Sequence, residues 1–160
     1  MNKTATHRSG GLSPALALAL LATACASGPY TAEVLAIGGK QLNPTFDKQP
    51  SAVNVRLFPL IDEAVFVQAS DADLMQSPDP KLGQGTWVPP YKDVVVYVGQ
   101  RDRIKIEIKP QVRFLGVLGL FNEDTGARRL VIDVKQLAEK KLVFDGFDVK
   151  AEPLTAEDTK

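Results

Sequence analysis

Apolar residues in the middle of this 160-residue chain recur at every second position, and this period limits the possible fold more than any other feature. Ile104, Ile106 and Ile108 alternate with charged side chains, which predicts a strand with one buried face and one solvated face. A period of two matches the alternation of side chains across a β-strand and does not match the face of a helix. The chain is therefore expected to build its core from sheets.

Similar runs before and after this segment give about seven short strands separated by turn residues. Two of them, 94–98 and 113–121, are almost continuously apolar, as expected of strands that are buried on both faces. This spacing predicts an all-β fold, an antiparallel β-sandwich. The remaining expected strands cover 32–37, 53–57, 104–108, 130–134 and 142–149.

One stretch departs from the period of two. After Asp62, a candidate N-cap, apolar residues recur at helical spacing, and we expect one short inserted helix at about 63–74. Residues 77–90, which are rich in proline and glycine, should form turns. A second, weaker helical turn should cover 135–140. We expect the inserted helix to cover one end of the sandwich or one edge of a sheet.

The N-terminal segment has the pattern of an export signal. A short basic head precedes an apolar run at 12–24, which is too short for a membrane span of about 20 residues. Small residues follow, directly before Cys25, the only cysteine of the chain. This order is typical of a cleavable secretory signal, and the cysteine after the small residues resembles a bacterial lipobox. We expect Cys25 to carry a diacylglycerol and an N-acyl chain.

This interpretation divides the chain into four parts. Residues 1–24 are the lipoprotein signal peptide, 25–31 the acylated cysteine with a short tether, 32–150 the β-sandwich domain and 151–160 a charged disordered tail. Ala26 stands where an aspartate commonly retains enteric lipoproteins in the inner membrane. By that analogy, the periplasmic face of the outer membrane is the expected location.

Composition excludes several classes of activity for the mature chain. Loss of Lys3 and Arg8 from the 19 basic residues leaves 17 against 19 acidic ones, so no basic field for nucleic acid is expected. Loss of the single histidine, His7, excludes Ser-His-Asp and Cys-His catalysis and zinc sites of the Cys/His kind. We therefore expect no enzyme, no metal and no cofactor apart from the lipid.

An ordered set of short motifs resembles the outer-membrane lipoprotein of type VI secretion systems, the TssJ (VasD/SciN) family. The set begins at Leu42-Asn43-Pro44, continues through the strand at 51–60 and ends with Phe114-Leu115-Gly116-Val117 and Phe121. Between these motifs stand Phe66, Gln68, Ala69, Leu74, Leu82-Gly83 and Gly99.

The resemblance implies a transthyretin-like β-sandwich that hangs from the outer membrane by its acylated cysteine. It also implies binding to the periplasmic domain of the inner-membrane protein TssM, and through it to the TssL/TssM complex. The family's contact with this partner uses the loop between the first two strands, which is about 39–51 here. We expect the partner-binding residues to be Leu42, Asn43, Pro44, Phe46 and Asp47.

The residues leave two other functions open. Trp87 and Tyr91 could form a platform for a glycan or another small ligand, although a lone tryptophan more often packs over a core. Paired carboxylates could run glycoside hydrolysis without histidine, although solvated surface accounts for them better. The pairs are Asp71 with Asp73, Glu123 with Asp124, and Asp145 with Asp148.

Phe46 also has two interpretations. An exposed apolar side chain at the tip of the 39–51 loop would be an interaction hot spot. A loop that folds back onto its own core would bury the same ring. The family resemblance favours the exposed position.

Overall fold

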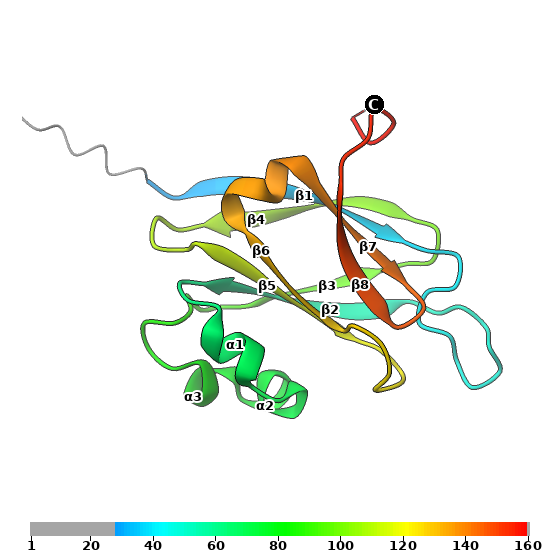
Figure 1. Cartoon of the computed structure of the whole chain (residues 1–160), viewed down its shortest axis with the longest axis horizontal. Coiled ribbons are helices and arrows are strands. Elements are labelled where there is room, and N and C mark those ends of the chain that lie inside the picture. Colours follow the sequence, from blue (N-terminus) through cyan, green and yellow to red (C-terminus); the bar gives the residue numbers. More distant parts are fainter. Residues whose placement is uncertain (1–27, 160) are drawn as a thin grey trace, which may run out of the picture.

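The computed structural model describes residues 28–159 of the chain, which form two four-stranded sheets packed face to face (Figure 1). Sheet A has the strand order β4-β1-β7-β8 and sheet B the order β3-β2-β5-β6. The all-β sandwich expected from the sequence is confirmed. The strands are β1 (Tyr30–Gly38), β2 (Val53–Leu60), β3 (Lys92–Val96), β4 (Arg101–Ile108), β5 (Phe114–Leu120), β6 (Arg129–Asp133), β7 (Lys140–Asp145) and β8 (Asp148–Pro153).

Most neighbouring strands are antiparallel, and one pair departs from the antiparallel arrangement. β1 pairs with β7 in parallel, with Leu35 opposite Lys141. The chain reaches β7 from the other sheet through a 3₁₀ helix at Val134–Glu139, where the helical turn was expected. All the strands that the structure describes, and both apolar clusters, lie after Gly28, so residues 26–160 include every element of the described fold.

Alternating side chains of sheet B feed two separate apolar clusters. Leu115 and Val117 of β5 point between the sheets into the main core, whereas Leu118 points outward into a second cluster. The nearly continuous apolar run of β5 is therefore explained by burial on both faces, as predicted. The second cluster consists of Phe58, Leu60, Phe66, Leu74, Leu82, Trp87 and Leu118.

The expectation that 94–98 is buried on both faces was wrong. β3 is the edge strand of sheet B and pairs only with β2. Val96 faces the core, but Val95, Tyr97 and Val98 are exposed. The helices cover another part of the outer face of this sheet, so these side chains stay exposed among residues 28–159.

Three short helices cover the outer face of sheet B, where a single helix was expected (Figure 1). They are α1 (Ala64–Gln68), α2 (Asp71–Gln76) and α3 (Pro78–Leu82). The break falls at Ala69, which is extended with ψ 148°, and Ser70 then caps α2 by accepting the Asp73 N–H at 3.1 Å. A helix also begins at Pro78, in the segment expected to form only turns. No helix within residues 28–159 is long and apolar enough to span a membrane.

Residues 151–159 form the end of β8 and a folded turn, so the expectation of a disordered tail at 151–160 was wrong for the residues that the structure describes. β8 extends to Pro153 and pairs with β7. Beyond it, residues 154–159 fold against the outer face of sheet A, where Leu154 N–H donates to Glu139 O at 2.9 Å. We call residues 155–158 the C-terminal clasp.

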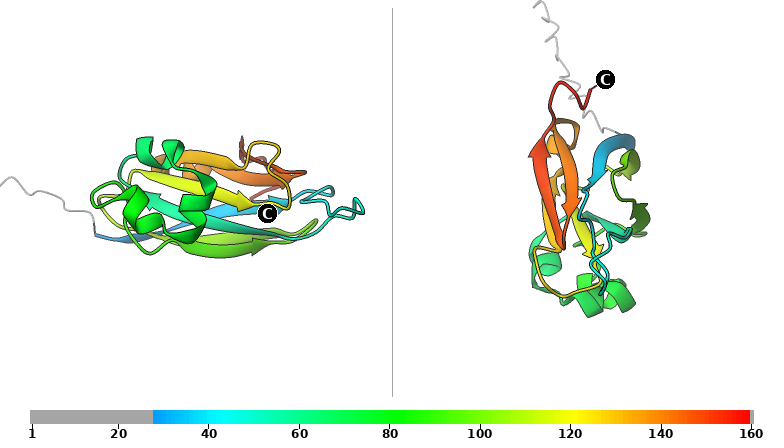
Figure 2. Two further views of the ribbon diagram at one scale, coloured as in Figure 1. Left: turned by 90° about the horizontal axis from the view of Figure 1, so that it is seen from below. Right: turned by 90° about the vertical axis from the view of Figure 1, so that its right-hand side faces the viewer.

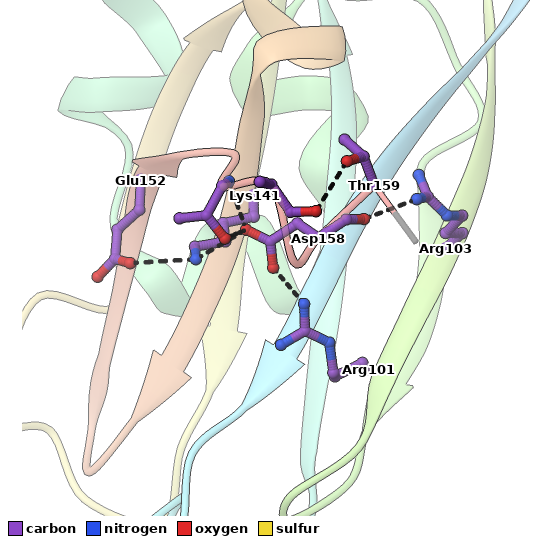
Figure 3. Close-up of polar contacts among 8 residues, drawn as sticks. Arg101, Arg103, Lys141, Glu152, Asp158 and Thr159 are labelled. Atoms are coloured by element: carbon purple, nitrogen blue, oxygen red, sulfur yellow. Dashed lines mark hydrogen bonds and ion pairs between the residues drawn. The ribbon is translucent and has the colours of Figure 1, made fainter.

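The clasp is held by a buried carboxylate that meets cations of sheet A (Figure 3). Asp158 accepts hydrogen bonds from Lys141 Nζ at 3.0 Å and from Thr155 N and Oγ1 at 2.7 and 2.8 Å, and it forms an ion pair with Arg101. Arg103 donates to the Asp158 main-chain oxygen at 2.9 Å. The charged composition of the tail suggested disorder. Composition alone does not show that Asp158 meets Lys141, Thr155 and Arg101 in the folded protein.

Candidate partner-binding site

Residues 39–52 connect β1 of sheet A to β2 of sheet B, and we call this segment the 39–52 loop. The loop lies at one end of the sandwich, and the described chain begins at the opposite end, next to Tyr30 (Figure 1). A view from another direction shows the same loop projecting beyond the ends of the strands (Figure 2). We call the end that carries the loop the distal end.

The base of the loop is tied to the β7–β8 turn. Gly39 N–H donates to Phe144 O at 2.6 Å, and Gln41 N–H donates to the Asp145 carboxylate at 3.0 Å. Gly146 N–H donates to Gln41 O at 3.1 Å. These bonds continue the β1–β7 pairing past the ends of the strands, so the loop leaves the sandwich from a fixed position.

Asn43 holds the two sides of the loop together. It is only 3% exposed and has a positive φ of 44°, which asparagine tolerates better than most residues. Its Nδ2 donates to Ala52 O at 2.7 Å and to Ser51 Oγ at 3.1 Å, and its Oδ1 accepts the Asn122 N–H at 2.7 Å. The preceding Leu42 is fully buried in the main core.

The tip of the loop is a tight turn. Thr45 O accepts the Lys48 N–H at 2.8 Å, and Thr45 N–H donates to Gln49 O at 2.9 Å. Lys48 has φ 57°, a left-handed angle of the kind that short hairpin loops often need at one residue. Phe46, one of the two central residues of this turn, is 99% exposed.

The structure therefore separates the five expected partner-binding residues into an exposed group and a buried group. Phe46 and Asp47 lie together on the exposed tip, and Pro44 is half-buried beside it. Leu42 and Asn43 face the interior and position the loop. The five residues share one loop but do not share one surface.

The sequence did not indicate a second exposed apolar segment at the distal end. Tyr97 and Val98, in the turn between β3 and β4, are exposed, and this turn is bonded to the end of β1. Gly99 N–H donates to Gly38 O at 2.9 Å, and Gly38 N–H donates to Gln100 O at 3.0 Å. The run of valines before the turn suggested a buried strand, so no sequence signal separated these residues from the core.

Trp87 is a core residue and not an exposed platform. Only 6% of it is exposed, and its ring stacks on Tyr91 with 6.5 Å between centroids and packs against Phe58 at 5.9 Å. Arg56 covers the Tyr91 ring at 4.0 Å. The interpretation of Trp87 as packing over the core is thus confirmed.

Most of the paired carboxylates have local structural partners. Asp71 bridges Arg128 and Arg129, which ties α2 to β6. Hydrogen bonding to Ser70, and then to Lys81, lowers the pKa of Asp73.

Asp145 and Asp148 serve loops of the distal end. Asp145 holds the base of the 39–52 loop, and Asp148 accepts the Ala127 N–H at 2.6 Å. This bond, and then Lys150, lowers the pKa of Asp148. A general acid in glycoside hydrolysis requires a raised pKa, so neither Asp73 nor Asp148 fits that role. Residues 28–159 contain no group of three or more His, Cys, Asp or Glu residues that could hold a metal ion.

Comparison with known proteins gives one family. Residues 31–146 match the family described as type VI secretion lipoprotein, VasD, EvfM, TssJ. A comparison with curated protein sequences gave no significant match.

Solved structures share the fold at low sequence identity. The T6SS lipoprotein TssJ1 from Pseudomonas aeruginosa is 21% identical, with a TM-score of 0.70 over 80% of this chain and 98% of that chain. Serratia marcescens Lip, described as a membrane-bound component of the type VI secretion system, is 15% identical, with a TM-score of 0.68 over 76% and 96%. A chain in a structure described as the C-terminal domain of the T6SS protein TssM from EAEC is 20% identical, with a TM-score of 0.65 over 78% and 98%.

Proposed function

Because the chain belongs to the type VI secretion lipoprotein family, we propose that it fastens a type VI secretion complex to the outer membrane. Residues 1–24 would be removed, Cys25 would be acylated, and the distal end would bind the periplasmic C-terminal domain of TssM. Cys25 lies outside the described residues, so its lipidation rests on the sequence. One chain with a similar fold belongs to a structure that is described as the C-terminal domain of TssM, and this supports the choice of partner.

The observation that carries the proposal is the position of Phe46. An aromatic ring that is 99% exposed on a tight turn costs hydration free energy, and binding to a partner would recover that cost. The turn and the Asn43 hydrogen bonds already hold the backbone of the loop in place, so little backbone entropy is lost on binding. Aromatic residues with these properties are typical anchors of interfaces.

The arrangement of the two ends agrees with the proposal. Gly28 follows Cys25 by three positions, a distance of at most about 11 Å in an extended chain. The end of the sandwich near Tyr30 would therefore lie close to the membrane, and the distal end would point into the periplasm. A partner anchored in the inner membrane would approach from that side.

Calorimetry with residues 26–160 and the periplasmic domain of TssM tests the proposal. Phe46→Ala or Asp47→Arg should leave the fold intact and weaken binding by about 1–2 kcal/mol, on the order of tenfold. Val67→Ala is the matched control, because Val67 is apolar and 60% exposed but lies on α1, away from the loop.

Equal affinity of the wild type and the two loop variants would exclude the tip as the binding site. A loss of affinity in Val67→Ala as large as in Phe46→Ala would place the interface elsewhere. Absence of binding between the wild type and its cognate TssM domain would refute the proposed function itself.

A further inference from the structure

An open groove with a volume of about 770 Å³ lies between the edge strands of the two sheets. β3 spans Lys92–Val96, whereas β4 in the other sheet spans Arg101–Ile108. Because β3 is shorter than β4, the half of β4 nearer the chain's entry faces the segment Val88–Tyr91 instead of a strand. The groove is thus a gap along the side of the sandwich at the end where the described chain begins.

The floor of the groove is apolar and belongs to the main core. Val88, Ile106 and Val112 line it and are each less than a tenth exposed. Pro89 and Tyr91 form one wall. These side chains are fixed by the core beneath them, so the groove is a formed site for hydrocarbon and does not need to open.

The rim of the groove carries an excess of positive charge. Lys92, Lys105 and Lys109 line it together with Asp93 and Glu107. Two of these charges are compensated by residues outside the rim. Arg56 forms an ion pair with Asp93 at 2.9 Å, and Glu33 forms one with Lys105 at 3.6 Å.

Two of the rim lysines stand without an acidic partner. Within residues 28–159, neither Lys92 nor Lys109 forms an ion pair with a carboxylate. Lys92 Nζ donates one hydrogen bond to the Lys105 main-chain oxygen at 2.6 Å, which leaves its charge uncompensated. Apolar floor and cationic rim together match a ligand with a hydrocarbon chain and an anionic head.

The groove lies near the proposed anchor. Thr31 lines it and follows Cys25 by six residues, so an extended chain would place the two within about 22 Å. The polar headgroup layer of the membrane would therefore be within reach of the lysine rim. This proximity depends on the lipidation of Cys25 proposed above, whereas the chemistry of the groove does not.

We propose that the groove binds an anionic phospholipid of the membrane that anchors the protein. The phosphate is held by Lys92 and Lys109, and the first carbons of an acyl chain lie on Val88, Ile106 and Val112. This second attachment limits the rotation of the sandwich about its tether and so sets the direction in which the distal end points.

The test uses residues 26–160, which lack Cys25, and two soluble probes below their micelle concentrations: dihexanoyl phosphatidylglycerol and dihexanoyl phosphatidylcholine. We expect tighter binding of the anionic probe. Lys92→Glu and Lys109→Glu should each weaken it at least about fivefold, the equivalent of about 1 kcal/mol per basic residue near an anionic lipid surface. The effect should diminish in 1 M salt, where the screening length is about 3 Å.

Charge and location are controlled separately. Lys40→Glu and Lys150→Glu make the same change of net charge away from the groove and should leave lipid binding unchanged. A fluorophore on Thr31→Cys, the only thiol of this domain, should shift to shorter wavelength on binding, and one on Thr125→Cys at the distal end should not.

Four results would overturn the proposal. They are absence of binding of both probes, equal binding of the two probes, equal effects of the groove and control lysines, and a fluorescence shift at position 125 alone. Since these measurements use no lipid anchor and no partner, their failure leaves the docking function of the 39–52 loop untouched.

Discussion

Two residues of the 39–52 loop have positive φ angles for different reasons. Lys48 is left-handed because the tight turn at the tip requires it, and its side chain is exposed. Asn43 is left-handed while its buried amide bonds to Ala52, Ser51 and Asn122. Both residues have left-handed backbone angles, but only the Asn43 side chain also stabilises the loop through hydrogen bonds.

Glycine at these two positions is expected to give opposite results. Lys48→Gly should leave the midpoint of urea unfolding unchanged or raise it, because glycine adopts left-handed angles without steric cost. Asn43→Gly should lower stability by about 2 kcal/mol or more, since the Asn122 N–H and the Ala52 carbonyl lose their partner. Equal stability of the two variants would show that the Asn43 side chain does not hold the loop.

Asp158 makes the stability of the clasp depend on pH. The N–H and hydroxyl of Thr155, followed by Lys141 and Arg101, hold the pKa of this carboxyl well below its usual range. Because the pKa of Asp158 is lower in the folded state than its unfolded value of about 3.9, the ionised carboxylate stabilises the fold. This contribution to the free energy of unfolding is present above about pH 4. That contribution is lost as the pH falls through the folded-state pKa.

Asp158→Asn should therefore lower the free energy of unfolding at pH 7, and its difference from the wild type should narrow below about pH 4. Urea unfolding at pH 7, 5 and 3 measures this difference. Glu157→Gln, a change of the same kind at the exposed neighbouring residue, should have little effect at any of the three values. A difference for Asp158→Asn that stays constant down to pH 3 would contradict the role given to its charge.

At the scale of the elements, α1 packs on β5 through a glycine. A Cβ atom on Gly116 would lie 3.0 Å from Leu60 Cδ1 and from two atoms of the Phe66 ring. The helices can therefore approach sheet B closely only because β5 has no side chain at this position.

Gly116→Val should lower the free energy of unfolding by about 1–3 kcal/mol, the usual cost of overpacking. The second variant, Phe66→Ala, opens space at the same contact. In the Phe66→Ala background, Gly116→Val should lower the free energy of unfolding by less than it does in the wild type. Chemical unfolding of the wild type, the two single variants and the double variant measures this coupling. Strictly additive effects would show that the two residues do not share the contact.

The sequence predicted those elements whose pattern is decided locally. β4 was predicted because its isoleucines alternate with charges, and β5 because its apolar run is buried on both faces. The edge position of β3 was not predicted, since a strand's neighbours depend on topology and not on its own residues. The division of the helix at Ala69 was also missed, because Ser70 is a cap only if the chain turns there.

The same limit applies to the candidate site. The family resemblance pointed to the 39–52 loop as the partner-binding site, which stays a prediction, and it favoured the exposed position of Phe46 that the structure shows. It did not separate Phe46 and Asp47 from the buried Leu42 and Asn43, because the side of a loop that faces inward is set by contacts with distant residues such as Asn122.

At the scale of the whole molecule, attachment to the membrane is expected to depend on a single sulfur atom. Cys25→Ser should release the protein from the outer-membrane fraction into the soluble periplasm and abolish secretion that depends on it. Cell fractionation measures the first effect, with Ser27→Ala as a control that keeps the cysteine. Wild-type fractionation and secretion by Cys25→Ser would refute the lipid anchor.

The parallel pairing of β1 with β7 has a consequence for the order of folding. Sheet B uses only residues 53–133, whereas sheet A joins β1 to strands that begin at Lys140. A chain that emerges with its N-terminus first must therefore wait for its last strands before β1 gains its second neighbour. Closing such long-range contacts is slow and leaves a strand edge exposed in the meantime. During this interval sheet B can form while one edge of β1 stays unpaired. That edge would be available to chaperones or to incorrect strand pairing.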